Sequence, residues 1–111
     1  MKIDKKESYW IIKDEKSDPK GFSNYLEKIA YKEFKDQNVV IDLLQYDALT
    51  LEELLGFLKV SNQHRGNNHS FVIVNDTILI DNVPDELAVV PTLLEAKDFI
   101  QMEELERDLG F

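Results

Sequence analysis

The stretch that decides the fold runs from Asn38 to Asn75 and reads NVVIDLLQYDALTLEELLGFLKVSNQHRGNNHSFVIVN. It holds two nearly unbroken apolar runs, Val39 to Leu44 and Phe71 to Val74, which suit strands buried on both faces. Between them Thr50 stands three positions before Glu53, the spacing of a capping box, and leucines then recur at helical intervals. The stretch therefore predicts a strand, a crossover helix and a second strand that is the parallel neighbour of the first.

Upstream of this stretch the sequence predicts one strand and one helix. Residues 9–12 are the strand candidate, and the charges around them suit an edge or peripheral position in the sheet. Asp18 and Pro19 mark a helix start, as N-cap and first helical residue. An apolar stripe then runs to Phe34 and predicts a helix that lies on the sheet. Residues 1–7 are expected to be frayed and solvated.

Downstream of this stretch the pattern is mixed at first and then clear. Residues 77–80 either extend the preceding strand or form a separate turn, and a short helical turn is expected near Pro84. Residues 88–90 predict a last strand, and the spacing of Thr92 and Glu95 repeats the capping box at the start of a last helix.

Length and composition predict one domain that spans residues 1–111. The chain has no cysteine, which excludes disulfides and thiolate chemistry. No segment is apolar enough for a signal peptide or a membrane span, so we expect a soluble cytoplasmic protein. Residues 102–111 are expected to be an acidic tail that packs as a last helical turn or binds a partner.

The net charge of −9 is unevenly distributed. Up to Asp36 the chain has nine lysines against eight acids, whereas from Gln37 onward it has four basic residues against fourteen acids. The two halves therefore carry +1 and −10, which sum to the net charge of −9. Because so acidic a surface repels phosphate groups, we expect no nucleic-acid and no membrane partner, and we favour a basic partner protein.

Two histidines are the first candidates for a chemical site. His64 and His69 flank residues 65–68, which read as an exposed loop between helix and strand. A metal site would need further ligands at characteristic spacings, and the sequence has none of them. The pattern therefore favours a loop over a metal site.

Two aspartates are the second candidates. Asp42 and Asp47 lie at the carboxyl end of the central strand, where α/β sheets usually carry their sites. Two carboxylates there suit acid and base catalysis or a magnesium ion. No glycine-rich phosphate loop or serine nucleophile accompanies them, so loop capping is favoured. A small-ligand or metal-assisted hydrolase that uses these two residues stays open as the alternative.

Three segments together resemble a STAS domain, the module of anti-sigma-factor antagonists and sulfate-transporter tails. They read VVIDLLQYDALTLEELLGFLK, SFVIV and VVPTLLEAKDFI. The family's strand ending in Asp-Leu matches Asp42 and Leu43, and its Pro-Thr-x-x-Glu-Ala helix start matches Pro91 to Ala96. The resemblance covers roughly residues 9–101. It implies an α/β fold with a mixed four- to five-stranded sheet and helices packed mainly on one face.

The resemblance also implies a partner-binding site at a helix start. In switched family members this start reads Asp-Ser-Ser-Gly, and a partner anti-sigma kinase phosphorylates the serine. The motif falls here on residues 50–53, and Glu52 occupies the phosphoacceptor position, so the usual phosphoserine switch is not expected. Thr50 is a weaker acceptor because its hydroxyl already serves as N-cap. The expected partner-binding residues are Asp47, Thr50, Glu52 and Glu53.

The closing segment from Val89 to Phe111 is also similar to small stand-alone STAS-like bacterial proteins that often bear the name ribonuclease Z. Such an enzyme needs two zinc ions held by an HxHxDH motif and further histidines, whereas this chain offers only His64 and His69. We therefore expect a non-enzymatic interaction module without catalytic residues, metal or cofactor. Its expected partner is an anti-sigma-type regulator, and the chain is expected to be a monomer or weak homodimer.

Overall fold

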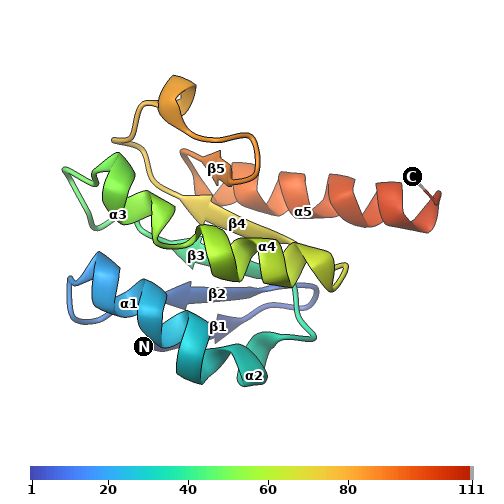
Figure 1. Ribbon diagram of the computed structural model, residues 1–111. Coiled ribbons are helices and arrows are strands. Elements are labelled where there is room, and N and C mark those ends of the chain that lie inside the picture. The colour runs from blue at the N-terminus through green and yellow to red at the C-terminus, as the bar shows by residue number, and fades with distance from the viewer. Residues whose placement is uncertain (111) are drawn as a thin grey trace.

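A five-stranded mixed sheet forms the centre of the structure, a computed structural model that describes residues 1–110 (Figure 1). The strands are β1 (Lys2–Lys5), β2 (Trp10–Lys13), β3 (Val39–Asp42), β4 (Phe71–Val74) and β5 (Ala88–Val90). They lie side by side in chain order, with β1 antiparallel to β2 and all other neighbours parallel. The predicted α/β class and mixed sheet are therefore confirmed.

The central unit has the predicted topology. β3 and β4 are parallel neighbours, with Val39 opposite Phe71 and Ile41 opposite Ile73, and every residue of both strands is buried. Their connection contains two helices, α3 (Leu51–Leu55) and α4 (Leu58–Gly66), where the sequence predicts one. The helix breaks at Gly56, whose amide N–H donates to the carbonyl oxygen of Glu53 at 3.2 Å and so tightens the turn.

The N-terminal residues differ from the prediction. Residues 1–7 were expected to be frayed, but Lys2–Lys5 form β1, and β2 is consequently an internal strand. Only Ile3 of β1 reaches the core, while its lysines are exposed. Exposed lysines are a common protection of an edge strand against pairing with other chains. The lysines that suggested a frayed end therefore belong to an edge strand and protect it.

The helical segment after β2 begins where the sequence predicts. It comprises α1 (Pro19–Tyr25), the π-helical turn η1 (Leu26–Ala30) and α2 (Tyr31–Phe34). Asp18 is the N-cap, and its carboxylate accepts a hydrogen bond from the backbone N–H of Gly21 at 3.0 Å. Of the predicted apolar stripe, Phe22, Leu26, Ala30 and Phe34 are buried in the core, whereas Tyr25 and Ile29 are exposed.

The chain between β4 and β5 contains little regular structure. It holds one 3₁₀ turn, η2 (Ile80–Asn82), and a turn in which the N–H of Leu87 donates to the carbonyl of Pro84 at 3.0 Å. Strand β4 is not extended through residues 77–80, because Asn75 ends it. The side-chain oxygen of Asn75 accepts hydrogen bonds from two following backbone N–H groups and folds the chain into a turn.

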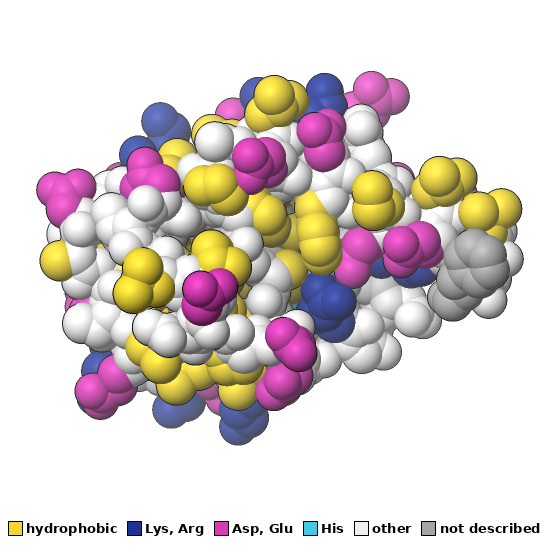
Figure 2. All heavy atoms as spheres, turned by 90° about the horizontal axis from the view of Figure 1, so that it is seen from above, with side chains coloured by type: hydrophobic (Ala, Val, Ile, Leu, Met, Phe, Trp, Pro, Cys, Tyr) yellow, Lys and Arg dark blue, Asp and Glu magenta, His cyan; other side chains and the backbone are white. Residues whose placement is uncertain are grey.

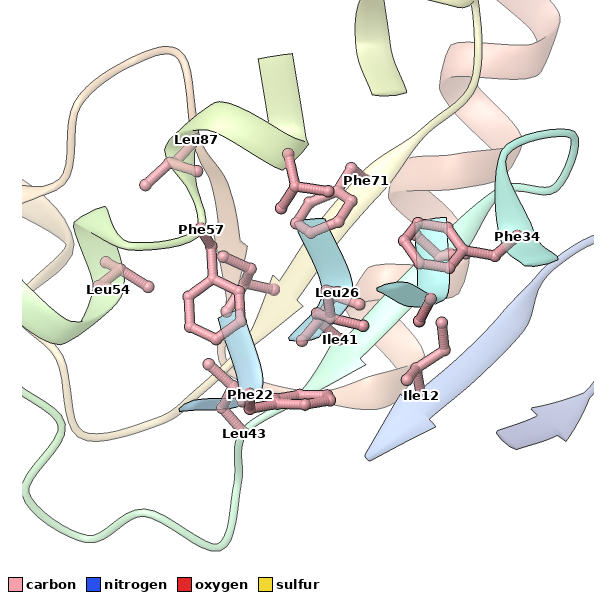
Figure 3. Close-up of a cluster of buried hydrophobic side chains, with 14 of the residues drawn as sticks. Ile12, Phe22, Leu26, Phe34, Ile41, Leu43, Leu54, Phe57, Phe71 and Leu87 are labelled. Carbon is pink, nitrogen blue, oxygen red and sulfur yellow. The ribbon is translucent and has the colours of Figure 1, made fainter. Parts of the chain in front are cut away.

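Both faces of the sheet are covered, because successive strand side chains point to opposite faces. On the first face, the strand residues Ile12, Ile41 and Phe71 pack against α1 to α4 (Figure 3). The opposite face is smaller and meets α5 (Leu93–Asp108), mainly through Ala96 and Ile100. The expectation of helices mainly on one face holds for α1 to α4, whereas α5 covers the other face.

The last helix includes most of the residues that were predicted to form a tail. Thr92 caps it as predicted, and the helix runs without a break through Asp108, so residues 102–108 are helical. Residue 111, which belongs to the predicted tail, lies outside the described residues. Over the described range 1–110, no helix has both the length and the apolar composition for a bilayer crossing.

Candidate functional site

The candidate site lies where the carboxyl ends of the four parallel strands meet, which we call the carboxyl edge. Open parallel sheets usually bind their ligands at this edge, beyond the strand ends. The four predicted partner-binding residues all belong to it, in the loop after β3 and in the first turn of α3. They are Asp47, Thr50, Glu52 and Glu53.

A capping box fixes the start of α3. The backbone N–H of Glu53 donates to the Thr50 hydroxyl oxygen at 3.1 Å, and the Glu53 carboxylate accepts from the Thr50 N–H at 3.0 Å. The Thr50 hydroxyl also donates to that carboxylate at 3.1 Å. Thr50 and Glu53 are therefore engaged with each other, while Glu52 is exposed and takes no part in the box.

Asn75 holds the loop that leads to this helix. Its buried side-chain amide donates to the carbonyl oxygens of Leu43 at 2.9 Å and Tyr46 at 3.1 Å. The same side chain accepts hydrogen bonds from Thr77 N–H and hydroxyl. The loops after β3 and β4 are thus tied together by one side chain.

A second buried contact connects the loop after β2 to the loop after β3. The hydroxyl of Tyr46 donates to the Asp14 carboxylate at 2.6 Å, and backbone N–H groups of Asp18 and Lys16 donate to it at 2.9 and 3.0 Å. Burial acts to raise the pKa of Asp14, but these hydrogen bonds outweigh it and lower that pKa below 3.8. Burial and the nearby carboxylate raise the pKa of Tyr46.

Asp14, Tyr46 and Asn75 were not predicted as site residues from the sequence. A signal for two of them was present, because a short polar residue directly follows β2 at Asp14 and β4 at Asn75, while β3 itself ends on Asp42. Parallel strands place such residues at one edge of the sheet. Tyr46 gave no comparable signal.

Three of the predicted residues, Asp47, Glu52 and Glu53, line two neighbouring hollows that share Glu53. One, of about 240 Å³, is lined by Ser17, Gln45, Asp47 and Glu53 among others. The other, of about 190 Å³, lies between α1 and α3, where Lys20 and Glu52 contribute to the wall. The structure therefore brings Asp47, Glu52 and Glu53 onto one acidic surface.

The two aspartates of the hydrolase alternative have separate environments. Asp42 is 8 % exposed, and its carboxylate accepts a hydrogen bond from the N–H of Leu44 at 3.0 Å. Asp47 is exposed and lines the first hollow, whose wall does not include Asp42. Within residues 1–110, no three side chains of the metal-binding types gather so as to hold an ion.

His64 does not lie in an exposed loop, and that part of the prediction is wrong. It is a fully buried residue of α4, and its Nε2 donates to the carbonyl oxygen of Gln37 at 2.6 Å. The ring centroids of Phe34 and Phe71 lie 5.4 and 6.0 Å from the centroid of the His64 ring. Burial lowers the pKa of His64 to about 4. The loop reading failed because α4 continues to Gly66 and turns this side chain inward.

Fold and site together define a small mixed α/β domain that presents a capped, acidic helix start at the carboxyl edge of its sheet. No protein-family model matches the chain, and a search of curated proteins finds no match. The resemblance to a STAS domain therefore stays a prediction from the sequence.

Proposed function

We propose that the chain is a non-enzymatic, STAS-like protein-interaction module that binds a partner protein through the acidic surface of its carboxyl edge. The partner is an anti-sigma-type regulator, as the resemblance implies. The observation that carries the proposal is the start of α3, where Thr50 and Glu53 close a capping box and leave Glu52 exposed beside them.

The order of the elements supports this proposal. β3 ends on Asp42 and Leu43 directly follows it, α3 begins at the position of the family's helix start, and β5 leads into a helix capped by Thr92. The sheet also follows the chain strand by strand, with β1 antiparallel. These features agree with the fold that the resemblance implies, a mixed sheet with strands and helices in alternation.

The chemistry of the helix start favours partner binding that phosphorylation does not control. Glu52 has no hydroxyl to phosphorylate, and the Thr50 hydroxyl both accepts from and donates to Glu53. Glu52 keeps its negative charge near the positive end of the α3 dipole, where an anion is favoured. A partner therefore meets a constant charge that does not depend on a kinase.

The acidic surface also defines the charge of the partner. Asp47, Glu52 and Glu53 lie together there, and Lys20 is the basic residue in the walls of the two hollows. A complementary partner presents lysine or arginine, and its binding weakens as salt screens the charges.

Affinity capture from the native cell tests the proposal, with partners quantified by mass spectrometry. We expect one partner to be captured by the wild type and lost with Glu52→Arg. Glu86→Arg is the matched control, because Glu86 is an equally charged, exposed residue outside the α3 start. The proposal fails if no protein is recovered, or if the recovered partner binds Glu52→Arg as well as the control.

A further inference from the structure

Helix α5 is held to the sheet in two different ways along its length. Its first half packs through the buried residues Ala96 and Ile100. Its second half extends past the strands (Figure 1) and is held by hydrogen bonds at the opposite, amino edge of the sheet. Glu103 accepts from the Ser70 hydroxyl at 2.6 Å and from Arg65 at 3.2 Å.

Further contacts complete this anchor. The side-chain amide of Asn38 donates to the Glu104 carboxylate, and the Arg107 guanidinium lies 3.4 Å from both the Ser70 hydroxyl and the Asn38 side-chain oxygen. Asn38 and Ser70 are themselves buried. The second half of α5 is therefore fixed in place although it buries few apolar side chains.

The outer face of this anchored helix carries four exposed apolar side chains. Leu94, Met102, Leu105 and Leu109 are 68, 62, 59 and 62 % exposed. At 3.6 residues per turn they fall within about 80° of the helix circumference, opposite Ala96 and Ile100. We call these four residues the α5 stripe. Figure 2 shows hydrophobic side chains along the projecting end of the molecule, with acidic side chains next to them.

Acidic residues lie beside the α5 stripe and, at Asp98, within it between Leu94 and Met102. Four exposed acids, Glu95, Asp98, Glu106 and Asp108, lie on the same helix, and Lys97 is the exposed base among them. Two copies of the chain that met through this face would bring these like charges together, which opposes a homodimer. A partner with basic residues beside an apolar ridge complements both the charge and the shape.

We propose that the α5 stripe docks an amphipathic helix of a partner protein, with lysine or arginine on both sides of its apolar face. Met102, Leu105 and Leu109 follow the i, i+3 and i+7 spacing of helix recognition, and Leu94 adds a fourth apolar side chain about two turns upstream. This surface is separate from the acidic surface around Glu52, so the proposal does not rest on the proposed function.

Titration of the isotope-labelled full chain with a synthetic helical peptide tests this proposal by NMR. The peptide has about 18 residues, enough for five turns, with leucines along one face and lysines beside them. A second peptide carries glutamates in place of the lysines. We expect the basic peptide alone to bind, with shifts along residues 94–109 and weaker binding as salt increases.

Leu105→Glu should weaken binding of the basic peptide by about tenfold or more, as expected for a central apolar contact. Leu79→Glu is the matched control, because Leu79 is 70 % exposed but lies outside α5, and it should leave binding unchanged. Met102→Glu repeats the test if Leu105→Glu alters the circular dichroism spectrum.

Four results would overturn the proposal. They are equal binding of the acidic peptide, equal loss with Leu79→Glu, shifts confined to the start of α3, and absence of any binding. Sedimentation tests whether a second copy of the chain occupies the α5 stripe. A dimer that Leu105→Glu dissociates would identify that second copy as the occupant and would also overturn the proposal.

Discussion

His64 shows how one buried side chain links this fold to pH. Its ring is fully buried, donates to Gln37 and lies among Phe34 and Phe71. The folded state holds its pKa at about 4, against an ordinary value of 6.5. Because the unfolded chain binds the proton more readily, stability is complete above pH 6.5 and is lost as the pH falls toward 4.

This shift predicts a loss of about 2 kcal/mol in the free energy of unfolding between pH 7 and pH 5. His64→Gln keeps a donor for Gln37 but does not titrate, so its unfolding free energy should change much less over this range. Urea unfolding at both pH values measures the difference. His69→Gln should keep most of the wild-type loss, because burial, more than the repulsion from His69, lowers the pKa of His64. An equal loss in His64→Gln and the wild type would assign the effect to other groups.

Residues were predictable from the sequence where their partners are near in the chain. Asp18, Thr50 and Thr92 each cap a helix by bonding to the residue three positions on. Tyr46 and Asn75 bond to residues 32 positions away, Asp14 and Leu43. Which long-range pairs form depends on strand order, which no local pattern contains. The strand ends mark Asp14 and Asn75 as residues of the carboxyl edge, but the long-range contacts that they make could not be predicted.

At the scale of elements, Gly56 decides how closely two helices approach. A Cβ atom on Gly56 would lie 2.9 Å from the Ser23 hydroxyl oxygen and 3.2 Å from the Glu53 carbonyl oxygen. Ser23 belongs to α1 and Gly56 directly follows α3, so the absence of a side chain permits the contact between these helices. The break between α3 and α4 lies at the same residue.

We predict that Gly56→Ala destabilises the fold by about 1–3 kcal/mol, the usual effect of overpacking a close contact. Adding Ser23→Ala removes the nearest atom and should recover part of the loss. Gly66→Ala is the control, because nothing lies within 4 Å of its added Cβ and it should be neutral or stabilising. Denaturant unfolding of the four chains measures this. A Gly56→Ala protein as stable as Gly66→Ala would show that the helices separate easily.

Elements were predictable where the apolar pattern is strong. β3, β4 and the capped helix starts follow from runs and spacings within a few residues of each other. β1 was missed because an edge strand with one inward apolar residue, Ile3, resembles a solvated end. The division of the crossover into α3 and α4 was missed, although Gly56 at the break is a weak helix former and gave a local signal for it.

At the scale of the whole molecule, the net charge of −9 opposes folding through repulsion within a compact chain. Within residues 1–110 few ion pairs offset it, and most of them lie at the surface, such as Lys59 with Glu27 at 3.0 Å. Surface pairs of this kind contribute little to stability. The thermal stability of the protein should therefore change with salt concentration.

We predict that about 0.5 M NaCl raises the midpoint of thermal unfolding at pH 7 by a few degrees, because salt screens the repulsion. The increase should shrink near pH 5, close to the isoelectric point of about 4.6, where the net charge is small. Calorimetry at two salt concentrations and both pH values measures it. A midpoint that falls with salt at pH 7 would mean that attractive pairs dominate.

The side chain of Asn75 has a kinetic consequence for any molecule that docks at the carboxyl edge. By joining the loops after β3 and β4, it sets the shape of that surface before contact. The loops lose their conformational entropy during folding, so binding of a partner does not have to order them again. Association there should proceed at a rate governed by diffusion and long-range attraction, with no slow rearrangement of this chain.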